Sequence, residues 1–224
     1  MTQETKANQG KGAIFDLDGT LLDSMGVWDQ VDVDFLAKRG IEVPDDYMQK
    51  VAAMQFRQIA EYTIARFGLS DTPEALMEEW DHMARVMYAT VVEAKPYARE
   101  YLESLKASGA KLAVATSLPP MLREPAMKHV GIFDYFDERG QRRRCWRRRQ
   151  KLSRTYICWP RRVSASNQGD CTVFEDLLVR HALGQVGRHA CVGHARRFLR
   201  RDWPEICDLA DGVMFDFHDA PVIL

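Results

Sequence analysis

The fold prediction for this 224-residue chain depends on one stretch of sequence, Gly12-Ala-Ile-Phe-Asp-Leu-Asp-Gly-Thr-Leu-Leu-Asp-Ser24. Its first four residues form a short apolar run that stops at an acidic turn, which is typical of a buried strand ending in a loop. Two later runs follow the same pattern, Lys-Leu-Ala-Val-Ala-Thr-Ser at 111–117 and Thr-Val-Phe-Glu-Asp at 172–176, and a final strand is predicted at 212–217. An amphipathic helix is predicted over 97–108. Strand, helix and strand at these lengths indicate a parallel α/β sheet.

Residues 25–95 show a helical pattern throughout, and they interrupt the sheet directly after its first strand. The clearest helix start lies at Asp71-Thr-Pro73, where Asp71 or Thr72 can cap the helix and the proline suits its first position. We therefore predict an α/β fold class: a Rossmann-like parallel sheet core over 11–24 and 96–224, with an inserted α-helical cap over 25–95.

Each of the three runs before residue 177 ends in polar groups that can bind or react. These groups are Asp16, Asp18, Thr116, Ser117, Glu175 and Asp176. In an open parallel sheet, ligands bind at the carboxyl ends of the strands, so we expect these groups to converge on one crevice. Four carboxylates there would repel each other unless a cation lies among them, and Mg²⁺ prefers carboxylate oxygens with waters. An Asp held by the metal can attack phosphorus and form an aspartyl-phosphate.

The string Phe15–Ser24 resembles the first signature of the haloacid dehalogenase-like hydrolases. The helical insertion after it is similar to that of the β-phosphoglucomutase and phosphoglycolate phosphatase branch. The resemblance covers residues 11–136 continuously, then 171–176, and more loosely 203–217. It implies a Mg²⁺ cofactor and phosphotransfer chemistry, because Asp18 stands where the true dehalogenases of the family lack a second Asp.

The resemblance also implies roles for individual residues. Asp16 would be the nucleophile and a Mg²⁺ ligand. Asp18 would protonate the leaving group, later activate the hydrolytic water, and reach the metal through its backbone carbonyl. Asp176 would be the acidic metal ligand of the fourth motif, with Glu175 supporting it directly or through a water. The hydroxyl of Thr116 would contact the phosphoryl group that is transferred.

Three further residues are expected to bind phosphate or substrate, and one to act as a catalytic cation. Ser117 and Gly19 are the expected phosphate contacts, beside Thr116 and after Asp16. Arg57 could reach a phosphate or hydroxyl of the substrate, and a solvated helix face fits it equally well. Lys151 lies 24 residues before Glu175, which suits the family's third-motif lysine that neutralises the nucleophile and the phosphate.

Two segments, 139–170 and 177–201, depart from the family pattern. The surroundings of Lys151 lack the Pro-Asp pair that usually follows the third-motif lysine. Our hypothesis is that both segments are translated out of frame, because codons allowed by degeneracy restore family-like sequence when they are read in another frame. This hypothesis implies disorder over 139–170 and the loss of the strand that should follow Asp176.

Charge is distributed unevenly along the chain. Residues 139–162 carry ten Arg and one Lys without any Asp or Glu, so this block has a charge of +11 while the remainder has −12. A nucleic-acid binder using Arg142–Arg149 with nearby aromatic residues is therefore an alternative class. Specific binding is disfavoured because the block follows no known binding-module pattern and the remainder would repel a polyanion.

The leading prediction is a Mg²⁺-dependent phosphatase that hydrolyses small phosphorylated metabolites, such as sugar phosphates, through an aspartyl-phosphate. The alternatives are a phosphomutase of the β-phosphoglucomutase type, a catalytically impaired chain of the same family, and a nonspecific nucleic-acid binder. No run approaches the roughly 18 apolar residues of a membrane span, and no signal peptide is evident, so we expect a cytoplasmic protein. We also expect a monomer. The five cysteines include no CxxC pair and suggest neither a disulfide framework nor a zinc site.

Overall fold

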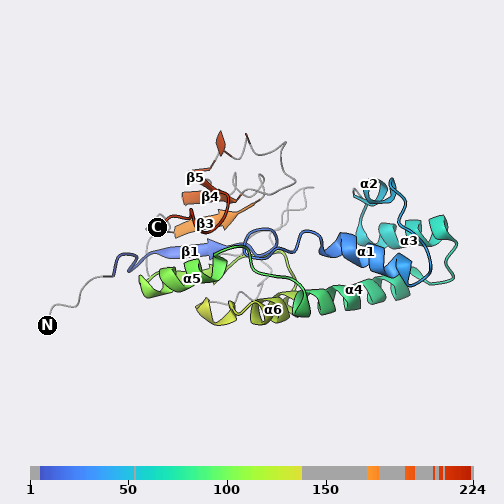
Figure 1. The fold of residues 1–224 in the computed structure, drawn as a ribbon, viewed down its shortest axis with the longest axis horizontal. Coiled ribbons are helices and arrows are strands. Elements are labelled where there is room, and N and C mark those ends of the chain that lie inside the picture. Colours follow the sequence, from blue (N-terminus) through green and yellow to red (C-terminus); the bar gives the residue numbers. More distant parts are fainter. Residues whose placement is uncertain are drawn as a thin grey trace, which may run out of the picture. The chain divides into compact units, whose positions relative to one another are not determined.

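The structure is a computed structural model, and it describes residues 6–52, 54–137, 171–176, 190–194, 204, 207–208 and 210–222. The chain divides into two compact units, Met1–Asp23 with Glu93–Leu224 and, inserted between these in the sequence, Ser24–Val92. The described part of the first unit is an α/β structure, and that of the second is helical (Figure 1). Within the described residues, every helix is too short or too polar to span a membrane.

In its described residues the first unit contains a parallel sheet of five strands, in the order β2-β1-β3-β4-β5. Figure 1 labels β1, β3, β4 and β5. The strands are β1 (Gly12–Phe15), β2 (Lys111–Val114), β3 (Cys171–Glu175), β4 (Ala190–His194) and β5 (Gly212–Met214). In the register, Phe15 lies opposite Val114 on one side and Phe174 on the other. The predicted parallel α/β fold is confirmed, and the carboxyl ends of β1, β2 and β3 lie at the same edge of the sheet.

Two expectations about the strands are wrong. β4 lies within the segment for which the out-of-frame hypothesis implied the loss of a strand, and it pairs in parallel with β3. The run Ala-Cys-Val-Gly-His is the same short, mostly apolar signal that predicted the other strands. β5 ends at Met214 instead of Phe217, because the Phe217 amide donates to the Pro96 carbonyl (3.4 Å) and residues 215–220 form bends and turns.

Aromatic rings build the core against β1 and β3. Phe15 stacks on Phe174, with ring centroids 4.5 Å apart and planes inclined by 10°. Tyr101 of α5 (Ala98–Ala107) meets both rings edge-on. Phe136 and Phe217 also contact Phe15, at 6.2 and 6.3 Å between centroids. Because burial of such rings is a large favourable term, this cluster fixes the position of the ends of β1 and β3.

Two further helical elements of the first unit follow β2 in the sequence. They are α6 (Pro120–His129) and the short 3₁₀ helix η1 (Phe133–Tyr135). Asp137, directly after them, binds the outer edge of β2: its backbone amide donates to the Leu112 carbonyl (3.0 Å), and its carboxylate accepts from the Leu112 amide (3.0 Å). The side chain of Asp137 also pairs with Lys106 and Lys111, and these contacts lower the pKa of Asp137 against the opposing effect of burial. Asp137 therefore covers backbone groups that an edge strand would otherwise expose.

The second unit contains four helices in its described residues, with an aromatic core of its own. They are α1 (Val27–Ala37), α2 (Tyr47–Val51), α3 (Phe56–Phe67) and α4 (Pro73–Thr90). Trp80 of α4 is buried against Phe35 of α1 and Phe56 of α3, with ring centroids 5.3 and 5.6 Å apart. Arg39 lies over the Phe35 ring and forms ion pairs with Asp71 and Glu79. These contacts join three of the helices into one unit.

The start of α4 provides a stability test. Thr72 Oγ1 accepts a hydrogen bond from the Ala75 amide (3.2 Å) and Pro73 takes the first turn, as predicted from the sequence. Thr72→Ala removes this cap, and we expect a loss of about 1 kcal/mol in the free energy of unfolding, measured by urea denaturation. Thr90→Ala at the other end of α4 is the matched control, with an expected change within about 0.5 kcal/mol because its exposed hydroxyl bonds only within the helix. Equal losses in both variants would contradict the capping role.

Candidate active site

Three buried carboxylates meet where β1 and β3 end. Asp16 directly follows β1, Glu175 is the last residue of β3, and Asp176 follows it; their exposed fractions are 4%, 1% and 0%. One carboxylate oxygen of each lies within 4.8 Å of the others. The Asp16 amide donates to the Phe174 carbonyl (3.1 Å), and this bond continues the β1–β3 pairing into the cluster. The parallel register therefore brings residues from distant parts of the chain to one place.

The composition of this carboxylate cluster (Asp16, Glu175 and Asp176) fits a divalent cation. Burial disfavours ionised carboxylates, and three of them so close would repel each other at low dielectric. A cation between them removes this cost, and an all-oxygen donor set suits a hard divalent ion such as Mg²⁺. The cluster includes three of the four predicted metal ligands.

The fourth predicted ligand, Asp18, lies in a tight loop after β1 and is half-buried. The loop is closed by hydrogen bonds from the Gly19 amide to the Leu22 carbonyl (3.0 Å) and from the Leu22 amide to the Leu17 carbonyl (2.8 Å). Gly19 has φ +80°, a left-handed conformation that glycine adopts without steric cost. The Gly19 amide donates within the loop and its conformation allows the chain to turn here, while its contact with phosphate stays a prediction.

Thr116 and Ser117 follow β2 at the same edge of the sheet. The Ala115 amide donates to the Phe15 carbonyl (2.8 Å), which continues the β1–β2 pairing up to these residues. Thr116 is half-buried, and its Oγ1 accepts from the Leu118 amide (3.2 Å); Ser117 is exposed. Both residues thus follow β2, which pairs with β1, at the edge of the sheet where Asp16 follows β1.

The remaining two predicted site residues are Arg57 and Lys151. Arg57 belongs to the second unit, where its exposed guanidinium pairs with Glu74 (2.7 Å) and Glu61 (3.0 Å); these carboxylates raise its pKa. Lys151 lies outside the described residues, as do the Arg-rich block, the segment 139–170 and most of 177–201. Their predicted roles and the out-of-frame hypothesis stay predictions.

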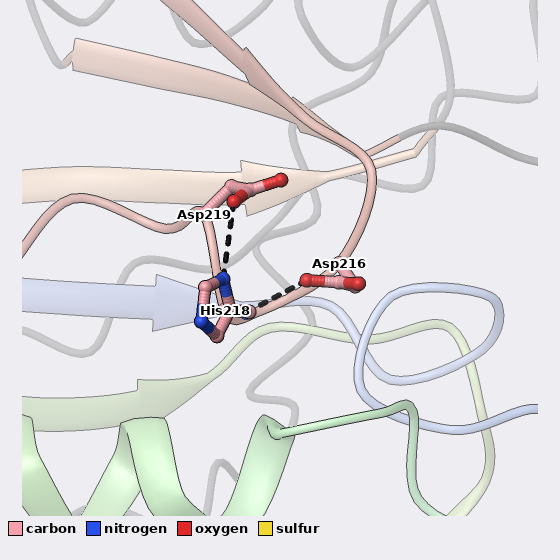
Figure 2. A group of neighbouring side chains, drawn as sticks. All are labelled: Asp216, His218 and Asp219. Atoms are coloured by element: carbon pink, nitrogen blue, oxygen red, sulfur yellow. Dashed lines mark hydrogen bonds and ion pairs between the residues drawn. The ribbon is translucent and has the colours of Figure 1, made fainter.

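A second group of possible metal ligands follows β5, and sequence reasoning missed it. Figure 2 shows Asp216, His218 and Asp219 side by side in one loop. Their possible ligand atoms lie within 4.8 Å of one another. The His218 amide donates to Asp216 Oδ1 (2.8 Å), and His218 Nδ1 lies 3.3 Å from Asp219 Oδ1. The only signal in the sequence is the local spacing Asp-Phe-His-Asp. These contacts are those of a surface turn, so we assign the site to the buried carboxylate cluster.

Comparison with known proteins identifies the family. A family model described as haloacid dehalogenase-like hydrolase matches residues 13–142, more than half of the chain. The chain therefore belongs to the haloacid dehalogenase-like hydrolase family, and the predicted resemblance is confirmed. Membership of this family implies a divalent metal cofactor, in agreement with the donor set of the carboxylate cluster.

One curated relative and several solved structures are similar to the chain. A phosphorylated carbohydrates phosphatase of Thermotoga maritima is 22% identical over 127 residues, which are 57% of this chain and 59% of that protein. A candidate β-phosphoglucomutase of the same organism has a TM-score of 0.72 at 17% identity, covering 91% of this chain and 94% of that one. A predicted phosphoglycolate phosphatase of Haemophilus somnus has a TM-score of 0.67 at 18% identity, covering 93% and 95%. At these identities the solved structures establish the shared fold.

Proposed function

We propose that the protein is a Mg²⁺-dependent phosphatase that hydrolyses small phosphorylated metabolites, such as sugar phosphates, through an aspartyl-phosphate. The observation that carries the proposal is the carboxylate cluster, three buried acids at the carboxyl ends of β1 and β3. The printed function of the Thermotoga maritima relative, a phosphatase of phosphorylated carbohydrates, supports the substrate class. We also propose that the protein is a cytoplasmic monomer. Light scattering of the purified chain would test its oligomeric state.

The carboxylates of Asp16, Glu175 and Asp176, with the backbone carbonyl of Asp18, are the proposed Mg²⁺ ligands. When bound, Mg²⁺ supplies charge neutralisation and positions the phosphoryl oxygens. The buried position of the three acids matters because electrostatic interactions are stronger where water is excluded. The acids thereby serve metal binding, and the bound cation would attract the phosphate that the acids alone would repel.

Asp16 is the proposed nucleophile. The carboxylate oxygen of Asp16 that does not hold the metal forms a bond to phosphorus while the bond between phosphorus and the ester oxygen breaks. Asp18 donates a proton to the departing oxygen, so that the product leaves as an alcohol. Asp18 then takes a proton from water, whose oxygen attacks phosphorus and releases inorganic phosphate, and Asp16 is restored. The sum of both steps is hydrolysis of one phosphate monoester by one water.

The residues around this centre would hold the phosphoryl oxygens. Thr116 offers a hydroxyl and Ser117 a backbone amide, while Gly19 allows the turn after Asp16 that directs the neighbouring amides. Lys151 is the proposed cation beside the phosphate. Arg57 is a proposed substrate contact, and its pairs with Glu61 and Glu74 fit a solvated helix face equally well.

Metal dependence is the first test. Phosphate release from p-nitrophenyl phosphate should require Mg²⁺, cease on addition of EDTA and return with excess Mg²⁺. Asp176→Asn removes one ligand charge, so we expect the Mg²⁺ concentration for half-maximal activity to rise at least about tenfold. Asp45→Asn, an exposed carboxylate of the second unit, is the matched control and should leave that concentration unchanged. Full activity in EDTA after removal of bound metal would overturn the proposal.

Product analysis separates the phosphatase from a phosphomutase. With glucose 1-phosphate as substrate, the proposal predicts release of inorganic phosphate and glucose. Glucose 6-phosphate as the main product would instead indicate a mutase, in which the intermediate is rephosphorylated. A folded protein without either product would be a catalytically impaired member of the family.

A further inference from the structure

A chain of hydroxyl groups connects three helices of the second unit. Tyr47 of α2 and Thr63 of α3 are both fully buried, and Asp32 of α1 is half-buried beside them. Thr63 Oγ1 lies 2.7 Å from the Ile59 carbonyl and 2.7 Å from Tyr47 Oη. Tyr47 Oη in turn lies 3.5 Å from Asp32 Oδ1. The three contacts thus run from Asp32 to Ile59 through two hydroxyl groups.

Counting hydrogens determines which way these hydroxyl groups point. The Ile59 carbonyl has no hydrogen, so Thr63 must donate to it and thereby uses its only hydroxyl hydrogen. Tyr47 must then donate to Thr63, and this uses the only hydrogen of the phenol. The contact between Tyr47 and Asp32 is left without a hydrogen unless Asp32 carries one. The distances agree, since the two contacts that have hydrogens are 2.7 Å long and the third is 3.5 Å.

We propose that Asp32, Tyr47, Thr63 and Ile59 form a pH-sensitive hydrogen-bond chain that is complete only when Asp32 is protonated. In that state Asp32 donates to Tyr47, Tyr47 to Thr63, and Thr63 to the Ile59 carbonyl. When Asp32 is ionised, its carboxylate faces a lone pair of Tyr47. The contact between α1 and α2 then becomes repulsive, or both hydroxyl groups reverse and the bond to Ile59 is lost. The chain therefore joins α1, α2 and α3 more strongly in acid.

The charged and titratable groups around the hydrogen-bond chain are consistent with a protonated Asp32 that donates to Tyr47. Burial raises the pKa of Asp32 to about 6; a donated Tyr47 hydrogen would oppose that rise, and the nearby Asp29 adds to it. Burial also raises the pKa of Tyr47 to about 12, so the phenol keeps its hydrogen at neutral pH. Tyr62 and Arg66 of α3 lie against the Tyr47 ring, and the charge of Arg66 is paired with Asp46.

The direction of the pH effect follows from the folded and unfolded states. In the unfolded chain Asp32 has its ordinary pKa of 3.8, and burial in the folded protein raises that pKa to about 6. The stability that protonated Asp32 contributes is fully present below pH 3.8 and is lost as the pH rises through about 6. Ionisation of Asp32 alone should raise the equilibrium constant for unfolding about tenfold between pH 4 and pH 7. This value allows for solvent screening, because Asp32 is partly exposed.

Carboxyl NMR of the full-length protein tests the proposal, with aspartate labelled at the side-chain carbon. One resonance should titrate near pH 6, and it should be missing in Asp32→Asn. In Tyr47→Phe the pKa of Asp32 should fall by about one unit, because its protonated form loses an acceptor. If Tyr47 instead donates to the carboxylate, the same substitution raises the pKa of Asp32 and overturns the proposal. A wild-type Asp32 that titrates below pH 5 would also overturn it.

A thermal unfolding series provides the second measurement. The side-chain amide of Asp32→Asn can donate to Tyr47 at every pH, as a protonated carboxyl does. We therefore expect the melting temperature of this variant to fall less, or to rise more, between pH 4 and pH 7 than that of the wild type. Asp34→Asn, an exposed charge removed from the same helix, is the matched control and should keep the wild-type pH dependence. Equal pH dependence in Asp32→Asn and the wild type would contradict the proposal. Neither measurement uses the carboxylate cluster or depends on the proposed phosphatase activity.

Discussion

Asp16→Asn is expected to abolish phosphate release, with a fall in kcat of at least about 1000-fold on p-nitrophenyl phosphate at saturating Mg²⁺. The substitution replaces the attacking carboxylate with an amide of nearly the same size, whose oxygen is a far weaker nucleophile. It also removes one of three negative charges from the carboxylate cluster, which weakens the proposed metal site. Both effects act at the reacting atoms. We therefore expect Asp16→Asn to reduce kcat more than any other single substitution at the site.

Loss of activity in Asp16→Asn must be separated from loss of folding. Because the substitution relieves repulsion among buried carboxylates, its melting temperature in EDTA should equal or exceed that of the wild type. A phosphoryl group should also be detectable on Asp16 by mass spectrometry of rapidly quenched wild-type enzyme and be absent from the variant. Retention of more than about a tenth of the wild-type kcat would rule out Asp16 as the nucleophile.

Phe174→Ala is expected to be the most destabilising single truncation in the first unit, with a loss of about 3–5 kcal/mol in the free energy of unfolding. Phe174 is fully buried and stacks on Phe15, and its ring also contacts Tyr101 and Phe217. Removal of the ring leaves a cavity between β1, β3 and α5 that backbone shifts can fill only partly. Since total stabilities of 5–15 kcal/mol are usual, much of the variant would be unfolded in moderate urea.

Phe215→Ala is the matched control for this truncation. Phe215 follows β5 and is 68% exposed, so removal of its ring loses little buried apolar surface. We expect its free energy of unfolding to change by less than about 0.5 kcal/mol, measured by urea denaturation under the same conditions. Similar losses for both variants would mean that the ring cluster around Phe15 does not dominate the stability of the first unit.

The pattern within single segments predicted much of the fold. The apolar run before Asp16, the similar runs before Thr116 and Glu175, and the cap at Thr72 all depend on residues close together in sequence. Strand burial, helix capping and the family signature can therefore be recognised without tertiary contacts. The family was predictable for the same reason, since its signature is one continuous string after β1.

Other features depend on contacts between distant segments. The apolar run at 212–217 was long enough for a strand, but a bond from Phe217 to Pro96 and an Asp216–His218 turn end β5 at Met214. β4 was missed because the unusual composition around it outweighed its own short apolar signal. In both cases the outcome was determined by pairing with another part of the chain.

The sequence by itself determined that acidic residues end apolar strands in a parallel α/β protein of the haloacid dehalogenase-like hydrolase family. The strand ends led us to expect that Asp16, Glu175 and Asp176 converge, but only the tertiary structure decided that they are buried with ligand atoms within 4.8 Å of one another. It also decided that Tyr47 contacts both Asp32 and Thr63 in the second unit. The physical reason is that periodicity and capping are local properties of the chain. Strand register and helix packing place side chains from distant segments within hydrogen-bond reach, and no pattern inside one segment encodes those distances.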